Sequence, residues 1–114
     1  MQAAMVRRLM YIEAKSQAIG GRGCIGWVDH HSRCRVYHYR GMVLRMSLAD
    51  PYNCFDAGSG ELYLVTKPKF DGRDKLHGGG VDIDEDARAE YWAQVRRRPD
   101  CLDVACFDAG PRRQ

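Results

Sequence analysis

Three histidines and a cysteine lie close together and have the side chains that transition metals prefer. They are His30, His31, Cys34 and His38. Imidazole and thiolate groups suit zinc, and ligands on the two arms of a turn can converge. However, all four fall in one expected hairpin, and adjacent strand residues such as His30 and His31 point to opposite faces. The pattern favours surface histidines. His31, Cys34 and His38 are weak metal candidates, and no cofactor is expected.

The stretch GGRGCIGW contains Gly21, Gly23 and Gly26 in the spacing G-x-G-x-x-G, which is the spelling of a dinucleotide-binding loop. That loop needs a strand before the first glycine and a helix after the last, because the helix N-terminus binds the pyrophosphate. Here WVDH follows the last glycine, and this is a strand-like sequence. We therefore expect a glycine-rich connection that leads into a strand.

Two further groups of residues are weaker candidates for a functional site. Cys54 and His77 are a possible nucleophile and base, but no oxyanion donor accompanies them, and Cys54 on an alternating strand is more typical of a small buried residue. The carboxylates of Asp82, Asp84, Glu85 and Asp86 suggest a site for a hard cation, but the EF-hand pattern is absent and helix capping explains two of them. No catalytic residue is therefore assigned.

Aromatic and basic residues gather in a second set, which consists of Trp27, Tyr37, Tyr39 and Arg40. On a curved sheet such residues can stack on single-stranded nucleic acid, although they also form ordinary cores and interfaces. These four are the candidate binding residues.

Charge argues against nucleic acid as the partner. The chain has 114 residues and a net charge of +3. Between Met10 and Asp100 there are 14 basic and 13 acidic side chains, so the basic excess lies mainly near the ends. No apolar run approaches the roughly 20 residues of a membrane span. With no export signal recognisable, the five cysteines are expected to be reduced thiols and the protein to be cytoplasmic.

The elements that must position these residues are mostly strands. One begins at Met10, and residues 24–30 alternate with Ile25 and Trp27 on one face. Residues 35–48 are expected to form one long strand with a bulge or bend at Gly41. Tyr37, Tyr39 and Val43 then lie opposite an apolar face made of Val36, Met42, Leu44, Met46 and Leu48. Residues 52–55 and 62–67 form a hairpin, and residues 81–83 add a short strand.

The one expected helix covers DEDARAEYWAQVRRRP. Asp84 is a suitable N-cap, Pro99 ends the helix, and Ala87, Tyr91 and Val95 form an apolar stripe with Trp92. The predicted class is α+β: a small, strongly bent antiparallel sheet, or a partly open SH3-like barrel of five to six strands, with this C-terminal helix across it. Residues 1–9 are predicted to be an extension, 10–99 the domain, and 100–114 a loosely ordered tail.

Several motifs occur in the order MYIEAKS, IGWV, YHYRG, NCFDAGSGELYLV, DGRDKLHGG and IDEDARAEYW. Together they resemble a group of small uncharacterised bacterial proteins, some of which are encoded on mobile gene cassettes of integrons. The resemblance covers about Met10 to Pro99 and implies no known activity, cofactor or catalytic residue. This chain departs from the pattern at Trp27, where arginine is common, and at DHHSRCR, where a Ser/Lys/Gly-rich turn is usual.

The function expected from these observations is a non-enzymatic binding or adaptor protein. Single-stranded nucleic-acid binding through the tyrosine face is the first alternative, and a small enzyme with an unrecognised site is the second. A homodimer or higher homo-oligomer is also expected, because one helix covers only one of two apolar strand faces. Leu102, Val104 and Phe107 of the tail are candidates for contacts with a partner chain.

Overall fold

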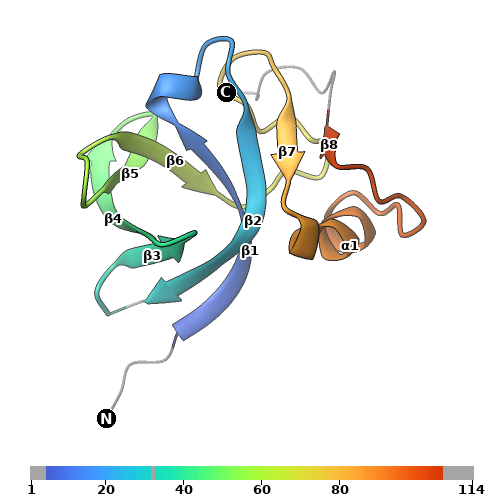
Figure 1. The fold of residues 1–114 in the computed structure, drawn as a ribbon, viewed down its shortest axis with the longest axis horizontal. Helices are drawn as coiled ribbons and strands as arrows, with labels where there is room; N and C mark the ends of the chain where they lie inside the picture. The colour runs from blue at the N-terminus through green and yellow to red at the C-terminus, as the bar shows by residue number, and fades with distance from the viewer. Residues whose placement is uncertain (1–4, 32, 107–114) are drawn as a thin grey trace.

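The fold is a closed antiparallel β-barrel with two additional strands and one short helical segment (Figure 1). The computed structural model describes residues 5–31 and 33–106. Its strands are β1 (Met5–Ala14), β2 (Gly23–His31), β3 (Val36–Tyr39), β4 (Met42–Ala49), β5 (Tyr52–Asp56), β6 (Leu62–Thr66), β7 (Val81–Ile83) and β8 (Ala105–Cys106). The first six form the barrel, which closes because β1 pairs with both β2 and β6. The α+β class is confirmed, but the barrel is closed where the sequence suggested a partly open one.

The two additional strands attach to the barrel through β2. Near its end β2 pairs with β3, whereas its first residues, Gly23 to Ile25, pair in parallel with β7. β8 then pairs antiparallel with β7. The β2 strand therefore divides the molecule into the barrel on one side and the C-terminal segment on the other (Figure 1).

The expected long strand over residues 35–48 is two strands, so that prediction was wrong. Arg40 and Gly41 both have positive φ angles, 48° and 79°, and Tyr39 pairs directly with Met42. This is a two-residue hairpin loop of the kind whose twist matches that of the flanking strands, and its two central residues need the left-handed region. The glycine that suggested a bulge is instead the second residue of a tight turn.

The turn changes which side chains share a face. Tyr37 pairs with Leu44, and Tyr39 pairs with Met42, so the tyrosines lie on the same side as the apolar residues of β4. Their expected placement on opposite faces was therefore wrong. Inside the barrel they join a core whose buried members are Met10, Ile12, Val28, Tyr39, Leu44, Cys54 and Val65.

A second core lies between the outside of the barrel and the C-terminal segment. There the helical segment packs on β1 and β2, as the stripe of Ala87 and Tyr91 predicted. The buried members are Tyr11, Ile25, Leu64, Val81, Ile83, Ala87, Tyr91, Trp92 and Cys106. The segment is less regular than expected: a 3₁₀ turn, η2 (Glu85–Ala87), leads into α1 (Arg88–Glu90) and a π-helical turn, η3 (Tyr91–Val95). It ends before Pro99, since Arg97 has a φ of 58°. None of the helices in the described ranges has the length and hydropathy needed to cross a bilayer.

Both ends of the described chain are more ordered than the sequence indicated. β1 begins at Met5 and pairs with β2 from its first residue, so residues 5–9 belong to the barrel. The short strand β8 lies within the expected tail. Leu102 and Val104 are exposed, at 62% and 57%. Phe107 lies outside the described residues.

Candidate binding pocket

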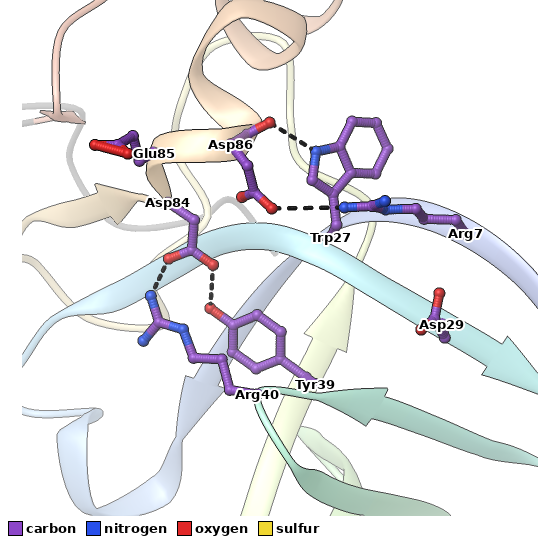
Figure 2. A pocket seen from close by; sticks show the side chains of 8 residues that line it. All are labelled: Arg7, Trp27, Asp29, Tyr39, Arg40, Asp84, Glu85 and Asp86. Carbon is purple, nitrogen blue, oxygen red and sulfur yellow. Dashed lines mark hydrogen bonds and ion pairs between the residues drawn. The ribbon is translucent and has the colours of Figure 1, made fainter.

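A polar pocket of about 580 Å³ opens beside β2, where the barrel meets the segment that follows β7 (Figure 2). Four parts of the chain supply its walls: β1, β2, the β3–β4 hairpin and the start of the helical segment. The lining residues are Arg7, Trp27, Asp29, Tyr39, Arg40, Asp84, Glu85 and Asp86.

One wall is built around the carboxylate of Asp84. The Tyr39 hydroxyl donates to it at 2.8 Å, the Cys24 thiol donates at 3.1 Å, and the Arg40 guanidinium forms an ion pair with it. We call these four residues the Asp84 cluster. Asp84 occupies the N-cap position as predicted, but its side chain makes no capping hydrogen bond. The carboxylate instead bonds to the barrel, because the turn at residues 40–41 brings Tyr39 and Arg40 beside it.

Gly26 makes room for this cluster. A Cβ atom at that position would overlap the Asp84 carboxylate and would lie 2.7 Å from the Tyr39 ring. The last glycine of the G-x-G-x-x-G pattern therefore allows the Asp84 and Tyr39 side chains to approach the β2 backbone, and a strand, not a helix, follows it. This confirms that the glycines lead into a strand.

The opposite wall is formed by Trp27 and its neighbours (Figure 2). The indole Nε1 donates to the backbone oxygen of Asp86 at 2.9 Å and so fixes the helical segment to β2. The Arg7 guanidinium lies 5.1 Å from the centre of the Trp27 ring and 3.5 Å from the Asp86 carboxylate. Arg7 therefore makes a cation–π contact and an ion pair at the same place.

Burial changes the acidity of two members of the Asp84 cluster. Burial raises the pKa of the Cys24 thiol to about 11, and it also raises the pKa of Tyr39 well above its usual value. Both groups therefore stay protonated at neutral pH and act as hydrogen-bond donors to Asp84. A protonated thiol is a poor nucleophile, because the thiolate is the reactive form.

Carboxylates outnumber guanidinium groups in the pocket. Arg40 pairs with Asp84, and Arg7 pairs with Asp86. Asp29 and Glu85 form no ion pair or side-chain hydrogen bond with any residue in the described ranges. The pocket therefore has a net negative charge and two carboxylates that are open to a ligand.

Three of the four candidate binding residues, Trp27, Tyr39 and Arg40, line this pocket. Tyr37 lies elsewhere, in a smaller depression beside Met46 and Asn53. Sequence reasoning missed Arg7, which it placed in an extension. It considered the carboxylates at residues 82–86 for a hard cation, attributed two of them to helix capping, and did not connect them with Trp27, Tyr39 and Arg40. Residues 5–9 (MVRRL) show no alternation of apolar and polar side chains, so the sequence carried no periodic signal for the start of β1 or for Arg7.

The metal candidates do not converge. The Cys34 backbone N–H donates to His31 Nδ1 at 3.4 Å, whereas His38 lies opposite Asp29 in the β2–β3 ladder. His30 stacks on Tyr37, with ring centres 4.8 Å apart. Within residues 5–31 and 33–106, no group of three or more His, Cys, Asp or Glu side chains is arranged to hold a metal ion.

Cys54 and His77 lie in different environments. Cys54 belongs to the barrel interior and is 1% exposed, and burial raises the pKa of its thiol to about 11. His77 is exposed in the loop between β6 and β7. The described structure does not bring them together as a nucleophile and base.

A second polar cluster, which the sequence did not indicate, lies on the outside of β1. Lys75 is 1% exposed, and its Nζ donates to Glu13 Oε2 at 3.3 Å and to the carbonyl oxygens of Gln17 and Ala18 at 2.7 and 2.8 Å. Glu13 also accepts from the Tyr11 hydroxyl and, at 3.1 Å, from the Leu76 N–H. We call Tyr11, Glu13 and Lys75 the Lys75 cluster. Its role is structural, since it attaches the long β6–β7 loop to the barrel.

Searches of the chain against protein-family models, curated proteins and solved structures found no match. The geometry of the pocket is therefore the basis for a functional assignment.

Proposed function

We propose that this chain is a non-enzymatic binding protein whose pocket takes a ligand bearing a guanidinium or ammonium group, such as a basic side chain. The observation that carries the proposal is the position of Arg7. This side chain is largely exposed, yet its guanidinium lies on the Trp27 ring and beside the Asp86 carboxylate. The chain's own arginine thus occupies the place that we assign to the ligand.

The side chains that line the pocket favour a cationic ligand over an anionic one. An aromatic face next to carboxylates attracts cations through both the ring quadrupole and charge. Asp29 and Glu85 add two carboxylates without described partners. A ligand would displace Arg7, whose ion pair is solvent-exposed and costs little to break, typically about 0–1 kcal/mol.

The test uses N-acetyl-arginine amide as the probe and N-acetyl-citrulline amide, which has the same shape without the charge, as its control. Binding can be followed by Trp27 fluorescence, because the other tryptophan, Trp92, is only 3% exposed. Arg7→Ala should strengthen binding of the arginine probe by about two- to fivefold, since it removes a competing cation worth about 0.5–1 kcal/mol. Asp86→Asn should weaken it by a similar factor.

Arg33→Ala is the matched control, because Arg33 is an exposed arginine outside the pocket. It should leave binding unchanged. Equal binding of the arginine and citrulline probes, or no effect of Arg7→Ala, would refute the proposal.

The other expected activities find less support. Stacking on single-stranded nucleic acid needs exposed aromatic faces, whereas Tyr39 is 5% exposed and the pocket is acidic. Self-association was expected from tyrosines on an uncovered face, and Tyr37 and Tyr39 now have neighbours in the barrel interior. A homodimer thus stays a prediction, and light scattering at several concentrations would test it.

Three further attributes belong to the same proposal. The short β3–β4 and β5–β6 hairpins, and the irregular register of β4 with β5 between Met46 and Ala49, support an SH3-like description. Five free cysteines support a cytoplasmic location. Membership of the integron-cassette group is supported by contacts between its motifs: Glu13 of MYIEAKS meets Lys75 of DGRDKLHGG, and Tyr39 of YHYRG meets Asp84 of IDEDARAEYW.

A further inference from the structure

The first half of β1 has one paired edge and one open edge. From Met5 to Ile12 this strand pairs with β2, but its ladder with β6 runs only from Tyr11 to Ala14. β6 ends at Thr66, and Pro68 follows two residues later. Proline has no N–H to donate to a ladder. Among the described residues, no strand therefore pairs with the second edge of Met5–Met10.

A groove of about 500 Å³ lies along this edge. Its lining residues are Arg8, Leu9, Met10, Lys67, Pro68 and Val95. Adjacent residues of β1 point to opposite faces of the strand, and yet both Arg8 and Leu9 border the groove. The groove consequently follows the edge of β1, in line with the end of β6.

The groove combines apolar walls with positive charge. Neither Arg8 nor Lys67 forms an ion pair or a side-chain hydrogen bond with another residue of the described part of the chain. Leu9, Met10, Pro68 and Val95 supply the apolar part of the lining. Met5 and Val6, further along the edge, are 47% and 42% exposed.

We propose that the open edge of Met5–Met10 is a docking site for an extended acidic segment of a partner protein, which adds as a strand beside β1. The backbone groups of β1 supply main-chain hydrogen bonds, and Arg8 and Lys67 select carboxylate side chains. Apolar residues that alternate with these carboxylates would contact Leu9 and Val95. Six residues of strand offer about 20 Å of edge, which suits a short linear motif.

A second copy of the chain is a poorer occupant for electrostatic reasons. Two-fold antiparallel pairing of this edge centred on residue 7 places Arg7 of one copy opposite Arg7 of the other, and pairing centred on residue 8 does the same for Arg8. Like charges directly opposite each other destabilise a strand pair, and charged edges protect sheets against self-pairing. The carboxylates of an acidic segment are attracted to the same arginine side chains.

The probe is a fluorescein-labelled heptapeptide that alternates valine and glutamate, and binding is measured by fluorescence anisotropy. Two control peptides are needed. In one, lysine replaces glutamate; in the other, the alternate backbone nitrogens are methylated, which keeps the charge and removes the donors. We expect only the valine–glutamate peptide to bind. Its binding should slow amide hydrogen exchange within Met5–Met10.

The variant Arg8→Glu/Lys67→Glu should weaken binding of the valine–glutamate peptide at least about tenfold. It should instead bind the lysine peptide, because charge complementarity selects the partner. The matched control, Arg33→Glu/Arg45→Glu, makes the same change in net charge at two exposed positions outside the groove. Equal binding of the methylated peptide, or an equal loss in the control variant, would reduce the site to a general electrostatic effect and overturn the proposal. A further measurement follows hydrogen exchange of Met5–Met10 at several protein concentrations without peptide. Protection that increases with protein concentration would also overturn the proposal, because the edge would then pair with a second copy.

Discussion

The Lys75 cluster and the Asp84 cluster both connect the C-terminal half of the chain to the barrel, but they differ in their access to solvent. The Lys75 and Glu13 side chains are 1% and 0% exposed, and all three Lys75 donors have protein acceptors. In the other cluster Asp84 is 13% and Arg40 61% exposed. A closed and fully hydrogen-bonded cluster holds the fold, whereas a cluster that reaches solvent can also meet a ligand.

Removing the Lys75 charge tests the closed cluster and should have the largest effect. Lys75→Met leaves Glu13 buried without its cation, so we expect the free energy of unfolding to fall by about 3–5 kcal/mol. Urea denaturation measures this change. Lys67→Met, an exposed lysine without a described partner, should stay within about 0.5 kcal/mol of the parent. A loss below about 1 kcal/mol for Lys75→Met would remove the distinction between the clusters.

Removing the Asp84 carboxylate should have an intermediate effect. Asp84→Ala leaves the Tyr39 hydroxyl and the Cys24 thiol without their acceptor, and we expect a loss of about 1–3 kcal/mol. Arg40→Ala should cost less than about 1 kcal/mol, because the guanidinium is largely exposed. Urea denaturation of both variants measures the two losses in the free energy of unfolding. Equal losses would mean that the ion pair, and not the buried hydrogen bonds, holds this wall of the pocket.

A change of pH should have the smallest effect, and it involves the Asp84 cluster through Cys24. The pKa of this thiol is about 11 in the folded state and 9.0 in an unperturbed cysteine, so the folded chain retains a proton that the unfolded chain loses. The free energy of unfolding should therefore decrease as pH rises from about 9 to 11. We expect about 1 kcal/mol from Cys24, because the thiol is only partly buried.

Denaturation of the parent and of Cys24→Ser at a series of pH values isolates this contribution, because the other titrating groups are common to both proteins. The difference in stability between the two should narrow above pH 9. A constant difference would show that the thiol does not titrate differently in the folded and unfolded chains.

Local patterns in the sequence identified most of the elements. The alternation of residues 24–30, the hairpin of residues 52–55 and 62–67, and the helix start after Asp84 all appear in the structure. The error at residues 35–48 came from a turn whose signal is weak, because arginine seldom takes a left-handed conformation. That single turn determines on which face Tyr37 and Tyr39 lie.

The sequence by itself determined where strands and the helical segment form, because periodicity and turn chemistry act between neighbouring residues. Only the tertiary structure decided which side chains meet. Tyr39 reaches Asp84 across 45 positions of the chain, and Lys75 reaches Glu13 across 62. Such pairs depend on barrel closure, on the attachment of β7 to β2, and on the face that each turn presents. The pocket, the buried ion pair and the open edge of β1 all follow from that long-range pairing, to which local sequence patterns are insensitive.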